Sequence, residues 1–106
     1  MAKSLGIFVT SPRHMRHIVG ITKAAVAKGS KVKVFFSWYS THLTQCAEFP
    51  ALCAMDNVDV SICADSYKNC GYDVMNDIPK GLDAKRMATQ AQHGAIIDDY
   101  DCYLTL

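Results

Sequence analysis

Short apolar runs alternate with helical patterns along this chain, and this alternation constrains the fold more than any other feature of the sequence. The first three runs are rich in valine, isoleucine and phenylalanine and bounded by turn or cap residues, as buried parallel strands are. With a run near the end of the chain, the predicted strands are residues 5–10, 31–37, 58–63 and 102–106. Strands that alternate with helices pair in parallel through right-handed crossovers. The sequence therefore predicts a three-layer α/β/α single domain with a mainly parallel sheet of four or five strands, in which 31–37 and 58–63 are buried central or near-central strands.

The clearest helical pattern lies between the first two predicted strands. Ser11 is a suitable N-cap and Pro12 a suitable first helical residue. Gly29 can close the carboxyl end, because glycine readily adopts the left-handed conformation found there. Apolar and small residues recur at helical spacing between these ends and predict the buried face: Met15, Ile18, Val19, Thr22, Ala25 and Val26.

A second helix is predicted after the second strand. Ser40 or Thr41 can cap it, and it would run through Leu43 and beyond. Pro50 should break or kink this helix, because an internal proline removes a hydrogen bond and clashes with the preceding turn. A short second helical piece is then expected over residues 51–55.

A last helix is predicted before the final strand. Asp83 can cap it and Gly94 can end it. The stretch before this helix is the least regular part of the chain, and a short extra strand fits at 73–76. The inward face of the helix would comprise Ala84, Met87, Ala88 and Ala91.

The composition fits one globular domain. Of the 106 residues, 50% are hydrophobic and 20% are charged, which suits a packed core and not a disordered chain. Eleven Lys and Arg stand against ten Asp and Glu, so the sequence lacks the basic excess of a nucleic-acid-binding protein. No apolar run reaches the length of a membrane span, and the first is too short for a signal peptide. We therefore expect neither nucleic acid nor a membrane as a partner.

The number of cysteines bears on the cellular compartment. The chain has five, an odd number, whereas small secreted domains usually carry an even set that pairs in disulfides. A core this apolar also has no need of disulfides for its stability. The sequence therefore predicts free thiols and a cytoplasmic protein.

The predicted strand ends gather the polar and reactive side chains. In an open parallel sheet, ligands bind at the carboxyl ends of the strands. Here those ends carry the segments TSPRH (10–14), SWYSTH (37–42) and CADS (63–66), which the predicted topology brings to one edge. Cys63 is the one cysteine in these three segments. A site at this edge would therefore be built around Cys63.

Two interpretations of Cys63 follow from its position. At the step from a strand to a helix, free amide groups and the helix dipole favour the thiolate, which suits a nucleophile or sulfur acceptor. Arg13, His14 or His42 could add positive charge and bind a substrate. Alternatively, Cys63 is a small buried hydrophobe, since cysteine is among the most buried residue types. Position alone leaves these interpretations equal.

The sequence likewise does not decide the role of the aromatic pair after the second strand. Trp38 and Tyr39 could line a ligand pocket or form an oligomer contact, and they could equally be ordinary packing. Among the other cysteines, Cys70 lies seven residues after Cys63. On one helix the two would be about 10.5 Å apart, too far for a disulfide, so packing is favoured for Cys70 over a resolving role. Packing in the core is likewise predicted for the three others: Cys46, Cys53 and Cys102.

Metal and nucleotide sites are not indicated. The cysteines form no C-x-x-C pair, and the His14/His17 pair has no cysteine or acidic residue close by, so no metal is expected and both histidines should face solvent. The first strand-to-helix turn, TSPRH, contains no glycine and matches no phosphate-binding loop. A serine nucleophile would need a G-x-S-x-G turn, which the sequence lacks.

Three segments together resemble the DsrE/DsrF-like, TusD-related sulfur-relay family. In that family an apolar strand ends in a cysteine, a turn of small residues follows, and a glycine comes eight residues later. The run VDVSICADSYKNCGY (58–72) is similar to this pattern, with Cys63 and Gly71 at the matching positions. The run KAAVAKGSKVKVFFS (23–37) resembles the family's first helix and second strand. The ending, an aspartate and a short apolar strand at 101–104, is similar too.

The resemblance implies both a fold and a function. The fold would be flavodoxin- or Rossmann-like. Cys63 would accept sulfane sulfur as a persulfide from a donor protein and pass it to an acceptor protein, with Cys70 as an accessory thiol and no cofactor. Such proteins are homo-oligomers, often trimers or hexamers. The alternative is a non-catalytic DsrE-like module that binds a small ligand or a protein and in which Cys63 only packs.

Overall fold

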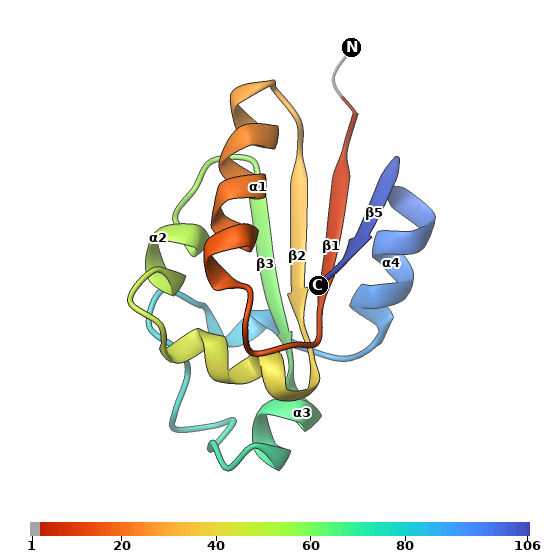
Figure 1. Cartoon of the computed structure of the whole chain (residues 1–106). Helices are drawn as coiled ribbons and strands as arrows, with labels where there is room; N and C mark the ends of the chain where they lie inside the picture. The colour runs from red at the N-terminus through yellow and green to blue at the C-terminus, as the bar shows by residue number, and fades with distance from the viewer. Residues whose placement is uncertain (1–2) are drawn as a thin grey trace.

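The computed structural model describes residues 3–106, which form a five-stranded sheet with helices on both faces (Figure 1). The strands all pair in parallel, in the order β4-β3-β2-β1-β5. They are β1 (Leu5–Val9), β2 (Val32–Phe36), β3 (Val58–Cys63), β4 (Met87–Ala88) and β5 (Cys102–Thr105). This architecture confirms the predicted three-layer α/β fold, and the two segments expected at its centre are the neighbouring strands β2 and β3.

Helical segments connect successive strands. The α-helices are α1 (Met15–Ala27), α2 (Phe49–Cys53), α3 (Ala64–Asn69) and α4 (Ala91–Asp99). Two 3-10 segments are η1 (Trp38–Gln45), after β2, and η2 (Ala84–Arg86), just before β4. Within residues 3–106, none of the helices is long and apolar enough to cross a membrane.

The main core lies on the face of the sheet that α1 and α2 cover (Figure 1). Alternate residues of the three central strands point to this face, because side chains alternate along a strand. They are Ile7 and Val9 of β1, Val34 and Phe36 of β2, and Val60 and Ile62 of β3. Met15 and Ile18 of α1 are buried against them, as the helical pattern predicted.

A smaller core lies on the opposite face, under α4. Ile96 of α4 is fully buried there with Phe35 of β2 and Cys63 of β3. A Cβ atom added at Gly6 of β1 would overlap the Ile96 side chain, so glycine at this position lets α4 approach the sheet. Several elements therefore cover the face with the main core, whereas mainly α4 covers the opposite face.

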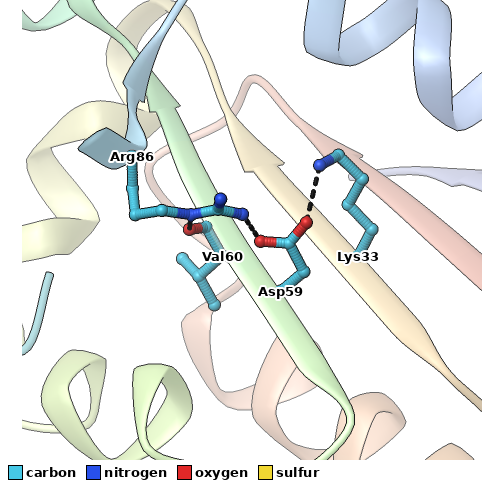
Figure 2. A network of polar contacts seen from close by, with 4 residues as sticks. All are labelled: Lys33, Asp59, Val60 and Arg86. Atoms are coloured by element: carbon cyan, nitrogen blue, oxygen red, sulfur yellow. Dashed lines mark hydrogen bonds and ion pairs between the residues drawn. The ribbon is translucent and has the colours of Figure 1, made fainter. Parts of the chain in front are cut away.

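A charged network joins β2, β3 and η2 on the α4 face (Figure 2). Lys33 of β2 lies opposite Asp59 of β3 in the register, and its Nζ is 2.8 Å from Asp59 Oδ2. Arg86 pairs with the other carboxylate oxygen and donates through Nε to the Val60 carbonyl at 3.1 Å. Only 7% of the Lys33 side chain is exposed. Burial, and then Arg86, lower the pKa of Lys33, whereas the charge of Asp99 raises it. The Asp59 carboxylate is the acidic group in direct ion-pair contact with this buried amine.

We expect Asp59→Asn to destabilise the protein by about 2 kcal/mol, because it removes the carboxylate that pairs directly with the buried Lys33 ammonium and with Arg86. The value lies below the usual cost of breaking a buried ion pair because 36% of the Asp59 side chain is exposed. Lys33→Met is the matched variant: it removes the buried charge and keeps the stem, so stability should change little. Urea unfolding at neutral pH measures both. Equal stability of Asp59→Asn and the parent would contradict this account.

The first helix begins later than its capping pattern predicts. Ser11 and Pro12 were expected to start it, but α1 begins at Met15 with His14 at the N-cap position. The reason is tertiary: the backbone amides of Thr10 and Ser11 both donate to the carbonyl of Leu106, at 2.8 and 3.3 Å. These residues are thereby tied to the end of β5. The other end of α1 follows the prediction, with Gly29 just past it at a φ of 84°.

The expectation for the segment after β2 was also wrong in detail. Ser40 and Thr41 do not cap a helix; they lie inside η1, which begins at Trp38 with Ser37 as its N-cap. The Ser40 hydroxyl accepts from the Ser37 amide at 2.9 Å, which closes a capping box. Pro50 lies in the first turn of α2, directly after Phe49, instead of breaking an earlier helix, since a proline in the first turn gives up no hydrogen bond.

The C-terminal third departs furthest from the sequence prediction. Asp83 caps a helix, accepting from the Lys85 amide, but that helix is the single 3-10 turn η2. Residues 87 and 88, expected inside a helix, form β4 beside the end of β3. The strand expected at 73–76 is a turn, in which the Asp73 carboxylate accepts from the amides of Met75 and Asn76. Helix α4 then starts at Ala91 and continues through Gly94, which was expected to end it.

Candidate functional site

A pocket opens at the carboxyl ends of the strands, as expected for a parallel sheet. The connections after β3 and β4 leave on opposite faces: Tyr67 of α3 is buried in the main core, whereas Ile96 of α4 is buried on the other face. Neighbouring strands whose connections diverge in this way leave a crevice between them. The pocket has a volume of about 330 Å³ and is lined by Ser37, Trp38, Tyr39, Cys63, Asp65, Ser66, Asn69, Cys70 and Gln90.

Cys63 lies at the floor of this pocket. It is the last residue of β3 and the N-cap of α3, so its place follows directly from the switch between strand and helix. Only 5% of the residue is exposed, and it packs with Phe35 and Ile96 while also lining the pocket. A reagent would therefore reach the Cys63 sulfur through the pocket.

The surroundings of Cys63 favour its thiolate. Burial opposes ionisation, but hydrogen bonds from the Ser66 hydroxyl and amide, the Gln90 side chain and the Asp65 amide outweigh it and lower the pKa of the thiol. These donors stabilise the ionised sulfur, which is the nucleophile.

A chain of neutral hydrogen-bonding groups connects three strand ends around the sulfur. Gln90, just after β4, donates from Nε2 to the hydroxyl of Ser37, just after β2, at 2.8 Å. The Ser37 hydroxyl lies 3.4 Å from the hydroxyl of Ser66, in the first turn of α3. Gln90 was not predicted from the sequence, because 84–91 was interpreted as one helix and no strand end was expected at residue 88. A strand of two residues is too short to show a recognisable pattern in the sequence.

Trp38 forms one wall of the pocket in a conformation that is rare for its type. Its φ is 53°, in the left-handed region that bulky side chains seldom adopt. The Trp38 carbonyl accepts hydrogen bonds from the Thr41 hydroxyl at 3.0 Å and the Cys70 thiol at 3.6 Å, which hold the residue there. Trp38 and Tyr39 are 63% and 61% exposed, so the strained backbone presents two aromatic rings beside the pocket. The pair therefore lines a pocket and is not packed in the interior, and its role as an oligomer contact stays a prediction.

Cys70 lines the same pocket as Cys63. It is the C-cap of α3, at the opposite end of this six-residue helix. The expectation that Cys70 packs against the sheet is wrong, because its thiol is turned toward the Trp38 carbonyl. The Cα atoms of the two cysteines are separated by the length of α3, about 10 Å, so a direct disulfide would require α3 to unwind.

The other predicted substrate-binding side chains do not line the pocket. Within residues 3–106, its lining contains Trp38 but not Arg13, His14 or His42. The Nδ1 of His42 is instead 2.7 Å from the Tyr72 hydroxyl. The ring of His14 lies edge-on to that of His17, with centroids 5.8 Å apart. Cationic side chains were expected around Cys63, and neutral donors lie there instead.

The remaining cysteines differ in their surroundings. Cys46 and Cys53 are half-buried, and burial raises the pKa of both thiols, that of Cys53 to about 11. Cys102 is exposed, which corrects the prediction of a core position. It lies at the start of β5, which pairs only with β1 and so forms an edge of the sheet. Within residues 3–106, no group of three histidine, cysteine or acidic side chains is placed to hold a metal ion.

Comparison with known proteins yields no relative for this chain: no family model, no curated protein and no solved structure matches it. The resemblance to the sulfur-relay family therefore stays a prediction, and the function rests on the pocket itself.

Proposed function

We propose that the protein is a sulfur carrier that accepts sulfane sulfur as a persulfide on Cys63 and passes it to a partner. The observation that carries this proposal is the surroundings of Cys63: a thiol with a lowered pKa at the floor of a pocket of about 330 Å³. A thiolate is the form that attacks sulfur. A recessed position suits a persulfide, which must be kept from water and from stray thiols until an acceptor arrives.

The proposed reaction needs no cofactor. The Cys63 thiolate attacks the outer sulfur of a persulfide or polysulfide, and a new S–S bond forms as the old one breaks. The donor leaves with the electron pair as a thiolate or a shorter polysulfide, so the transferred sulfur is itself the oxidant. An acceptor thiolate later attacks the outer sulfur on Cys63 and restores the Cys63 thiolate. The neutral donors of Ser66 and Gln90 would stabilise negative charge on sulfur at both stages.

Sulfur loading can be tested by treating the native protein with inorganic polysulfide, removing the excess and releasing the bound sulfur with cyanide as thiocyanate. We expect close to one equivalent per chain, because one thiol combines a pocket with a lowered pKa. Protein whose thiols are blocked beforehand is the control. Loading no greater than that of the blocked protein would contradict the proposal.

The proposal also includes the cellular compartment and the oligomeric state of the protein. All five cysteines are free, which supports a reducing compartment such as the cytoplasm. Ile97 and Tyr103 are exposed large side chains near the β5 edge, and they support self-association into a homo-oligomer. Light scattering at micromolar concentration tests this point, and a monomer would contradict it.

A second function fits the same pocket. A non-catalytic module could use the exposed rings of Trp38 and Tyr39 to bind a small ligand or a protein, with Cys63 as part of the wall. The strained Trp38 backbone is the observation in its favour, because strain of this kind gathers at binding sites. The two functions differ in the reactivity of Cys63, which only the sulfur carrier requires.

A further inference from the structure

The charges around the pocket point to the kind of molecule that it takes. Among the described residues that line it, no lysine, arginine or histidine is present, and Asp65 carries the negative charge. The Cys63 thiolate would add a second negative charge. The other polar groups are neutral hydroxyls and amides. An anionic sulfur compound would meet repulsion here and find no cation to pair with.

The two aromatic side chains of the pocket also favour a positively charged ligand. The faces of tryptophan and tyrosine rings attract cations through their quadrupoles, and Trp38 and Tyr39 hold their rings beside the pocket with centroids 6.1 Å apart. Both side chains are more than half exposed, so a cation can approach their faces from solvent. A carboxylate and two aromatic faces on one pocket form a receptor for an ammonium group.

The position of Asp65 and the size of the pocket limit which ammonium compounds can bind. Asp65 is in the first turn of the helix that Cys63 caps, and both residues line the same pocket of about 330 Å³. A small molecule that carries an amine a few bonds from its sulfur can therefore contact both. Cys63 is only 5% exposed and lines a pocket near the small end of the range for ligand sites, so a narrow molecule reaches its sulfur more readily than a protein surface does.

From these observations we infer that the pocket binds low-molecular-weight aminothiols in their disulfide or persulfide form, with the ammonium group at Asp65 and the sulfur at Cys63. This inference rests on the proposed function, since the persulfide form is the sulfur donor: the Cys63 thiolate bonds to its outer sulfur, the S–S bond breaks, and the aminothiol leaves as a thiolate. The disulfide form transfers no sulfane sulfur. There the Cys63 thiolate bonds to one sulfur, the other half leaves as a thiolate, and the mixed disulfide that results reports on binding to the same pocket.

Three symmetrical disulfides that differ in charge test the inference. Cystamine carries two ammonium groups, bis(2-hydroxyethyl) disulfide is neutral, and 3,3′-dithiodipropionate carries two carboxylates. The rate of mixed-disulfide formation at Cys63 is measured by peptide mass spectrometry and divided by the rate for a free small thiol, which removes intrinsic reactivity. We expect cystamine to exceed the neutral disulfide by about fivefold or more, and the dianion to fall below it by a similar factor, at low salt.

Asp65→Asn should remove most of this charge preference, so that the ratio of the cystamine rate to the neutral-disulfide rate falls toward one. Asp56→Asn is the matched control, because it removes the same charge from an exposed position outside the pocket lining. Exposed Cys102 serves as an internal reference that should show no preference beyond that of the free thiol. Equal relative rates for the three disulfides at Cys63, or a full preference in Asp65→Asn, would overturn the aminothiol inference and leave the sulfur carrier standing. A Cys63 that neither exchanges with any disulfide nor loads from polysulfide would overturn both.

Discussion

Cys63→Ser is expected to reduce the cyanide-releasable sulfur to the level of the thiol-blocked protein, a loss of at least tenfold. The side-chain oxygen cannot carry sulfane sulfur, and the cysteines outside the pocket have raised pKa values or lack its donors. Stability should change by less than about 1 kcal/mol, because residue 63 is the N-cap of α3 and serine is among the best N-cap residues. Thiocyanate release and urea unfolding, measured on the same preparation, provide the two numbers.

Cys70→Ser is the matched control for this variant, since Cys70 lines the same pocket from the other end of α3. It should keep most of the loading. A Cys63→Ser protein that still loads like the parent, or a Cys70→Ser protein that has lost loading while Cys63→Ser has not, would show that Cys63 does not hold the sulfur. The non-catalytic binding module would then be the better account.

The second large effect is a difference in alkylation between two cysteines of the native protein. At pH 7, iodoacetamide should modify Cys63 more than about 100-fold faster than Cys53, because the thiolate fraction falls tenfold for each unit of pKa. Burial raises the pKa of Cys53 to about 11, whereas the donors around Cys63 lower its pKa despite burial. Isotope-coded iodoacetamide and peptide mass spectrometry measure both rates at once.

The dependence of these rates on pH has a definite sign. A lowered pKa means that the rate at Cys63 should level off at a lower pH than for an ordinary thiol, and the rate at Cys53 should still be rising at pH 10. In urea the two profiles should coincide, since unfolding removes both environments. A Cys63 rate that levels off above the pH of an ordinary thiol would contradict the thiolate environment described above.

The regular parts of the fold could be predicted from the sequence because their signals are local. β2 and β3 are short segments rich in valine, isoleucine and phenylalanine, and the buried face of α1 follows helical spacing, so each element shows its character within a few residues. The same holds for Cys63, whose place at the end of β3 can be read from the change of pattern after Ile62.

The parts that could not be predicted depend on contacts between distant residues. β4 has two residues, too few for any periodicity, and is a strand only because it pairs with the end of β3. Without β4 the residue that follows it, Gln90, could not be placed at the pocket. Cys102 could not be recognised as exposed, because a sequence pattern does not say which strand lies at an edge. The late start of α1 likewise depends on hydrogen bonds to Leu106.

The most direct test of the central claim locates the sulfur on the native chain. The protein is treated with a limiting amount of polysulfide, its persulfides are trapped by alkylation, and the peptides are analysed by mass spectrometry. We predict that the mass of an added sulfur appears first and predominantly on the peptide that contains Cys63, with Cys46, Cys53 and Cys102 gaining little. Sulfur spread evenly over the five cysteines, or absent from Cys63 while present on Cys102, would contradict the assignment of Cys63 as the sulfur acceptor.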